Sequence, residues 1–128
     1  MTTASRTLRA FWTDGPTGEP GRQLTREEAL DVWADSRGTR GNFFGLTDDL
    51  GRTIQFYFCE SIPDNVDDAG HLAIVDLDIP DPKRRGSFSR CVSIDEVAEH
   101  ITKAFEVGVE REQFEPLTFA RWDGSEPD

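Results

Sequence analysis

Residues 52–60 alternate between apolar and more polar side chains, and this pattern constrains the fold more than any other part of the sequence. The alternation runs through Thr53, Ile54, Gln55, Phe56, Tyr57, Phe58 and Cys59. A period of two is that of a β-strand with one face in the core and the other face outside it. The turn signal Asp-Asp-Leu-Gly occupies 48–51, so we predict a hairpin that pairs 42–47 with 52–60.

Four other segments also have strand patterns, at 6–13, 71–79, 87–92 and 117–122. In the segment 71–79, Val75, Leu77 and Ile79 share one predicted face. Asp76 and Asp78 lie on the opposite predicted face. The Gly- and Pro-rich segment 14–22 is predicted to be turn.

Two capping boxes mark the starts of two predicted helices. Thr25 and Glu28 form the first box and predict a helix over 26–37, and Ser93 and Glu96 form the second. The second helix carries an apolar stripe that is typical of packing on a sheet, and we expect it to end near Gly108.

Together these elements predict an α+β fold, with a mostly antiparallel twisted sheet of about six strands and two helices packed on one face. The predicted order is β-α-β-β-β-β-α-β. The 128 residues are expected to form a single domain, 1–128, with frayed ends at 1–5 and 124–128. Trp33 is expected in the core, and Trp12 and Trp122 in the core or at a sheet edge.

Charge excludes two classes of partner. The chain has 25 acidic and 14 basic residues and a net charge of −11, which argues against nucleic acid and against an anionic membrane surface. No Lys or Arg lies between Arg52 and Lys83. That base-free segment carries seven acids, namely Glu60, Asp64, Asp67, Asp68, Asp76, Asp78 and Asp81. We therefore expect the charge to form one local surface.

The sequence contains few groups arranged for chemistry. It has no phosphate-binding glycine loop and no nucleophile elbow, so no catalytic residue or cofactor is predicted. Cys59 and Cys91 are expected to be buried thiols of a reduced, cytoplasmic protein. His71 and His100 are expected to be structural, with His100 partly exposed on its helix.

Asp76 and Asp78 allow three interpretations. They alternate on a strand, so about 6.5–7 Å separates them on one face, a spacing that resembles a metal or glycosidase acid pair. A solvated face and a partner-binding face are the other two interpretations. The complete absence of bases from the segment favours partner binding, and no metal site is predicted.

Several segments resemble a bacterial polymorphic-toxin immunity family, whose members often sit beside deaminase and nuclease-like toxins. The similar segments are Gly41–Leu46 after the first helix, Ile54–Phe58, Ser93–Ala98 running on to Phe105 and Gly108, and Ala120–Trp122. The resemblance spans roughly 24–122. It implies an inhibitor without catalytic residues, which binds one cognate toxin beside its active site.

We therefore predict a non-enzymatic immunity or antitoxin-like protein that binds a cognate toxin or another basic protein. Basic clefts that hold phosphates suit an acidic inhibitor, because opposite charges speed association. The predicted contact residues are Tyr57, Glu60, Asp64, Asp67, Asp68, Asp76 and Asp78. The alternatives are an acidic adaptor for another basic protein and a metal-binding or enzymatic domain that uses Asp76 and Asp78. Weak pairing of two copies through a sheet edge is a further expectation.

Overall fold

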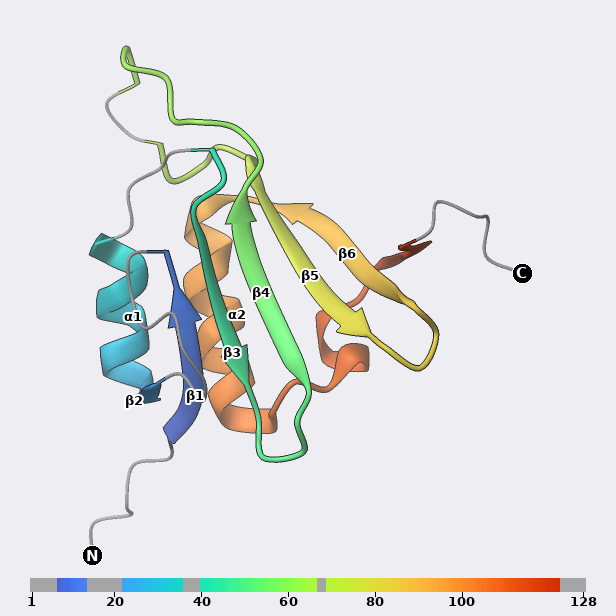
Figure 1. Cartoon of the computed structure of the whole chain (residues 1–128). Coiled ribbons are helices and arrows are strands. Elements are labelled where there is room, and N and C mark those ends of the chain that lie inside the picture. The colour runs from blue at the N-terminus through green and yellow to red at the C-terminus, as the bar shows by residue number, and fades with distance from the viewer. Residues whose placement is uncertain (1–6, 14–21, 36–39, 67–68, 123–128) are drawn as a thin grey trace, which may run out of the picture.

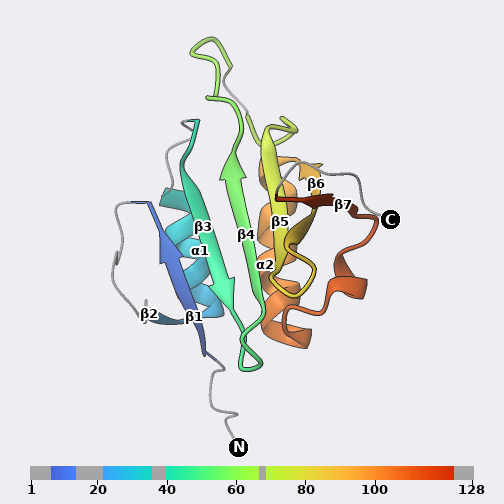
Figure 2. The ribbon, with the colours of Figure 1, turned by 45° about the vertical axis from the view of Figure 1, so that its right-hand side comes forward.

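The structure is a computed structural model, and it describes residues 7–13, 22–35, 40–66 and 69–122. Within these residues, seven antiparallel strands form one open sheet, and two α-helices cover one of its faces (Figures 1 and 2). The strands lie side by side in the order β2-β1-β3-β4-β5-β6-β7. The predicted α+β architecture is confirmed.

The elements follow one another along the chain with short connections in the middle of the sheet. Their bounds are β1 (Thr7–Trp12), β2 (Arg22–Thr25), α1 (Arg26–Asp35), β3 (Phe43–Thr47), β4 (Thr53–Phe58), β5 (Val75–Asp81), β6 (Gly86–Val92), α2 (Ile94–Val107), the 3₁₀ turn η1 (Arg111–Phe114) and β7 (Thr118–Arg121). The predicted hairpin is β3–β4, with Phe43 opposite Tyr57 and Thr47 opposite Thr53.

One strand was missed, and another was predicted to begin too early. Of the turn predicted over 14–22, only Arg22 is among the described residues, and it begins the short strand β2, which pairs Leu24 with Leu8 of β1. Four residues just before a capping box give no period-two signal. The strand predicted from residue 71 begins at Val75, because the Leu72 amide donates to Ala69 in a turn and the ladder with β6 begins at Val75.

Both capping boxes are formed as predicted. The amide of Glu28 donates to the Thr25 hydroxyl at 3.2 Å, and the Thr25 amide donates to the Glu28 carboxylate at 2.8 Å. At α2, the Ser93 amide donates to the Glu96 carboxylate at 2.6 Å. These bonds satisfy amides that a helix start otherwise leaves without partners. In the described part of the chain, neither helix is long and apolar enough to cross a membrane.

The core lies between the helices and the face of the sheet that they cover. Trp33 of α1 stacks on Phe58 at 5.4 Å between ring centroids, so its predicted place in the core is confirmed. His100 of α2 is buried between Phe56 and Phe114, so its predicted partial exposure was wrong. It lies on the apolar stripe of α2. Its Nε2 accepts a hydrogen bond from the Arg90 guanidinium at 3.2 Å, and because a guanidinium can only donate, the proton of the neutral ring is on Nδ1.

Asp48 connects the β3–β4 turn to the segment that follows α2. Its carboxylate is buried and accepts from the Arg52 amide at 2.9 Å, the Arg52 Nε at 2.8 Å and the Val109 amide at 2.8 Å. Burial alone would raise the pKa of Asp48, but the hydrogen bonds from Val109 and Arg52 outweigh it and lower this pKa. The predicted turn therefore also holds the end of α2 in place.

Candidate partner-binding face

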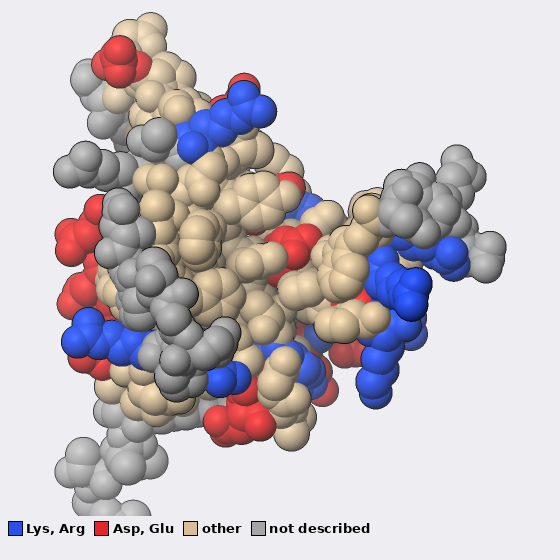
Figure 3. Space-filling model, viewed as in Figure 1, with Lys and Arg blue, Asp and Glu red and all other residues tan. Residues whose placement is uncertain are grey.

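The face of the sheet without helices brings together side chains from five strands and from the residue after β7. We define the open face by Phe11, Phe43, Gln55, Tyr57, Asp76, Asp78, Ser87, Cys91 and Trp122. The strand register places them in rows across the sheet: Phe43, Tyr57, Asp76 and Cys91 lie opposite one another in turn, and so do Gln55 and Asp78. Figure 3 looks onto this face, which is mostly uncharged with carboxylates near its middle.

Tyr57 and Asp76 form the closest polar pair on the open face. The Tyr57 hydroxyl donates to Asp76 Oδ2 at 2.6 Å, between adjacent strands β4 and β5. This hydrogen bond raises the pKa of the Tyr57 hydroxyl, and partial burial raises it further. Tyr57 therefore remains a proton donor, and the hydrogen bond holds its hydroxyl beside the Asp76 carboxylate.

Asp78 belongs to a second hydrogen-bonded group that reaches β7. Gln55 Nε2 donates to Asp78 Oδ2 at 3.0 Å, and Ser87 also hydrogen-bonds to this carboxylate. Trp122 Nε1 donates to Ser87 Oγ at 2.8 Å. Burial and the nearby charge of Asp76 raise the pKa of Asp78, against the two hydrogen bonds that lower it. The group fixes these side chains and orients the Trp122 ring.

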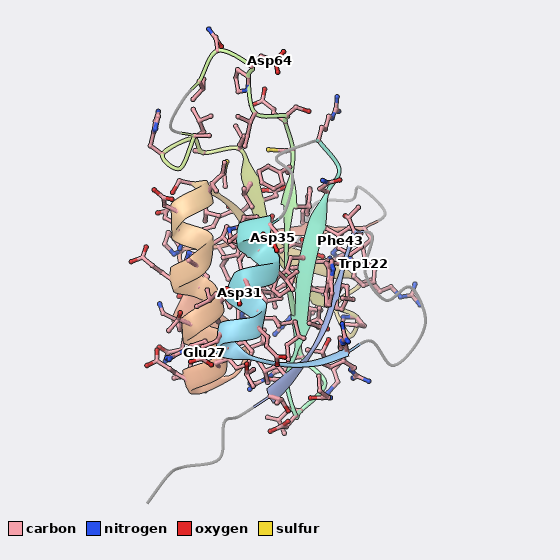
Figure 4. All side chains as sticks on the ribbon, turned by 90° about the vertical axis from the view of Figure 1, so that its left-hand side faces the viewer. Glu27, Asp31, Asp35, Phe43, Asp64 and Trp122 are labelled. Carbon is pink, nitrogen blue, oxygen red and sulfur yellow. The ribbon has the colours of Figure 1, made fainter. Side chains whose placement is uncertain are left out.

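Aromatic side chains surround the two carboxylates. Phe11 lies over Gly45, and its ring centroid is 6.1 Å from that of Phe43. Phe43 is 37% exposed and Trp122 is 57% exposed, and Figure 4 shows both on the side away from the helices. Of the two places predicted for Trp122, the core and a sheet edge, the structure has the sheet edge, because Trp122 follows the edge strand β7 and its ring is exposed. Exposed aromatics beside acids are suited to a partner with cationic side chains.

Both cysteines are exposed, so their predicted burial was wrong. Cys91 lies on the open face opposite Asp76, and Cys59 follows the last residue of β4. The Cys91 thiol donates to the Ala73 carbonyl at 2.9 Å, and the Cys59 thiol donates to the Ile74 carbonyl at 3.1 Å. Partial burial and the neighbouring Cys59 raise the pKa of the Cys91 thiol. A strand pattern alone does not say which face is covered.

The described members of the seven predicted contact residues lie in two places. Tyr57, Asp76 and Asp78 lie together on the open face, as their strand parity predicts. Glu60 and Asp64 are exposed on the long loop between β4 and β5, which projects beyond the sheet with Asp64 near its tip (Figures 1 and 4). Asp67 and Asp68 lie outside the described residues. The two parts can contact one partner only if it covers both the sheet and the loop.

The prediction of one local acidic surface was wrong in two ways. Asp81, the last acid of the base-free segment, pairs with Arg84 at 2.6 Å and lies 3.9 Å from Arg111, which comes from a distant segment. Acids also lie along the outer side of α1, where Figure 4 labels Glu27, Asp31 and Asp35. Arg84 and Arg111 lie outside the base-free segment in the sequence, but the fold places both of them beside its last acid, Asp81.

The metal interpretation of Asp76 and Asp78 gains no further ligands from the fold. Among the described residues, no group of three or more His, Cys, Asp or Glu side chains is placed to hold a metal ion. Asp76 is instead engaged by Tyr57, and Asp78 by Gln55 and Ser87. Side-chain donors therefore satisfy part of the hydrogen-bonding capacity of both carboxylates.

The sequence interpretation missed the aromatic part of the face. Phe43 lies in the predicted hairpin segment 42–47, and the register of that hairpin places it opposite Tyr57. The register is the signal that could have found it. Phe11 and Trp122 carry no such signal, because the strand opposite Phe11, β3, and the neighbour of β7, β6, are distant in sequence from them.

Comparisons of the chain with known proteins add no relative. No protein-family model, no curated protein and no solved structure matches it.

Proposed function

We propose that the chain is a non-enzymatic immunity or antitoxin-like protein, which binds a cognate basic toxin with the open face and thereby inhibits it. One observation carries the proposal: two hydrogen-bonded carboxylates lie among exposed aromatic rings on a sheet face that no helix covers. The resemblance of residues 24–122 to immunity proteins supports the same role.

The arrangement on the open face suits an arginine of the partner. A planar guanidinium can stack on the Phe43 or Tyr57 ring and donate to Asp76 at the same time. Tyr57 takes only one of the several positions at which the Asp76 carboxylate accepts, so capacity remains for an incoming donor. The hydrogen bonds of Gln55 and Ser87 hold Asp78 in place beforehand, which lowers the entropy cost of binding.

The test uses purified proteins encoded beside the gene of this chain. Calorimetry measures binding of each one to the full chain, and co-expression measures protection of cells from the toxic one. The open-face variant is Asp76→Asn with Asp78→Asn. Loss of a charge-assisted hydrogen bond is worth about 1.5–3 kcal/mol, so we expect binding to weaken roughly 10- to 100-fold.

The matched control removes the same charge from the other side of the molecule. Asp31→Asn with Asp35→Asn changes two exposed acids of α1, and we expect it to leave the affinity within about twofold. Equal weakening by both variants would show that net charge, not the open face, governs binding. A binding partner that is not toxic would contradict the immunity role.

A further inference from the structure

A second surface of opposite charge lies at the β6–β7 edge of the sheet. It is a hollow of about 600 Å³ lined by five basic and two aromatic residues: Lys83, Arg84, Arg85, Arg111, Arg121, Phe88 and Phe119. We call it the basic pocket. Figure 3 shows basic side chains gathered at this edge of the molecule. The basic pocket shares no residue with the open face, so the inference drawn from it stands apart from the proposed function.

Three separate segments build the basic pocket. The β5–β6 turn supplies three consecutive cations, and the Arg85 amide donates to the Pro82 carbonyl at 3.2 Å. Arg85 adopts the left-handed region, with φ of 53°, which is uncommon for a residue other than glycine. Its carbonyl accepts from the Trp122 amide at 2.9 Å, so the turn is fastened to the end of β7. The turn therefore holds like charges close together in a fixed conformation.

Phe88 forms an aromatic base for the pocket. The Arg111 guanidinium lies 4.1 Å from the ring centroid of Phe88, and that of Arg84 lies 5.8 Å from it. Phe119 packs against Phe88 at 4.9 Å. Gly86 makes this approach possible, because a Cβ there would lie 2.5 Å from both the Ala120 carbonyl oxygen and the Phe119 ring. A guanidinium stacked on a ring keeps its N–H edge available to acceptors, and Asp81 and Glu112 take up part of that edge here.

Positive charge exceeds negative charge at this place in a chain of net −11. Asp81 pairs with Arg84, and Glu112 lies 3.8 Å from Arg111. Even without Arg121, which is already engaged, four bases line the pocket against these two acids among the described residues. An anion would relieve the remaining repulsion among the bases.

The geometry points to the ligand: we propose that the basic pocket binds a small molecule that carries two or more phosphate groups. Guanidinium groups match phosphate oxygens through paired hydrogen bonds, and the bases come from three segments around one hollow. The volume is within the range of about 300–1,000 Å³ that holds small ligands. A long nucleic acid is disfavoured, because it would extend past the pocket over a chain of net −11.

The test measures calorimetric binding of tripolyphosphate, ATP and adenosine to the full chain at low ionic strength. The pocket variant is K83Q with R84Q and R85Q, all in an exposed turn. The matched control is R22Q with R26Q and R40Q, which removes three exposed bases elsewhere. We expect tripolyphosphate to bind at least tenfold more weakly to the pocket variant and within twofold to the control. If the pocket variant does not fold, Lys83→Glu alone takes its place, with the same direction expected.

The outcomes separate the sources of the phosphate groups. Equal affinity for tripolyphosphate and ATP identifies the phosphate chain as the ligand, and at least tenfold tighter binding of ATP shows that the nucleoside also contacts the pocket. Either result supports the proposal. No heat with tripolyphosphate or ATP at millimolar concentration, binding of adenosine equal to that of ATP, or equal weakening by the control would overturn it.

Discussion

Asp48 joins two parts of the chain that are distant in sequence. Its carboxylate caps its own turn by accepting from the amides of Leu50 and Arg52. It also accepts from the Val109 amide, 61 positions away, so one side chain connects the β3–β4 turn to the segment that follows α2.

Replacing Asp48 by asparagine is expected to lower the free energy of unfolding by about 3 kcal/mol, because buried amide and guanidinium donors lose a charged acceptor. The pKa of Asp48 is depressed in the folded protein. Its stabilisation is therefore present above about pH 4 and is lost as the pH falls through the folded-state pKa. Urea unfolding at pH 7 and pH 3.5 measures both effects, and Asp31→Asn on α1 is the exposed control.

His100 predicts a second pH dependence. Burial lowers the pKa of His100 to about 4, and the charges of Arg90 and Lys103 act in the same direction, against Glu96. The unfolded chain binds a proton near pH 6.5 and the folded chain does not, so stability falls as the pH drops from 6.5 towards 4. We expect wild type to lose about 2 kcal/mol between pH 7 and pH 5 through this group.

The variant His100→Leu should show a smaller loss of stability between pH 7 and pH 5 in urea unfolding. A proton NMR titration of His100 gives an independent check. A titration of His100 with its midpoint near 6.5 would contradict the proposed cause.

At the scale of elements, the parts with strong local signals were predicted well. Capping boxes and period-two alternation depend on residues within one turn or one strand, so both helix starts and the β3–β4 hairpin were found. The strand β2 was missed because four residues are too few for a periodic signal. The position of the open face could not be predicted with certainty, because which side the helices cover depends on the whole sheet.

Gly45 shows how one element depends on another. A Cβ at Gly45 of β3 would lie 2.3 Å from the ring of Phe11 in β1, so that ring must move when alanine is introduced. We expect Gly45→Ala to destabilise wild type by about 1–2 kcal/mol. In a Phe11→Ala background the same change should be neutral or stabilising, because alanine favours a strand over glycine.

The double-mutant cycle of Gly45→Ala and Phe11→Ala, measured by urea unfolding, isolates this contact. A coupling energy near zero would show that the ring of Phe11 does not occupy the space above Gly45. The cycle reports on the aromatic side of the open face without requiring a partner.

At the scale of the whole molecule, charge is distributed by the fold and not by the order of residues. The base-free segment predicted one acidic surface, but those of its acids that the structure describes are divided between the open face, the β4–β5 loop and a pair with Arg84. The bases of the basic pocket come from three segments, of which only 83–85 is visible as a cluster in the sequence. The net charge of −11 therefore describes neither surface.

The long-range bond of Asp48 also has a kinetic consequence. The hydrogen bonds within the β3–β4 turn close a short loop, whereas the bond to Val109 joins residues 61 positions apart, so we expect the bond to Val109 to form late in folding. An interaction absent from the folding transition state slows unfolding without speeding folding. The bond from Asp48 to Val109 should therefore lower chiefly the unfolding rate, and so lengthen the lifetime of the folded protein.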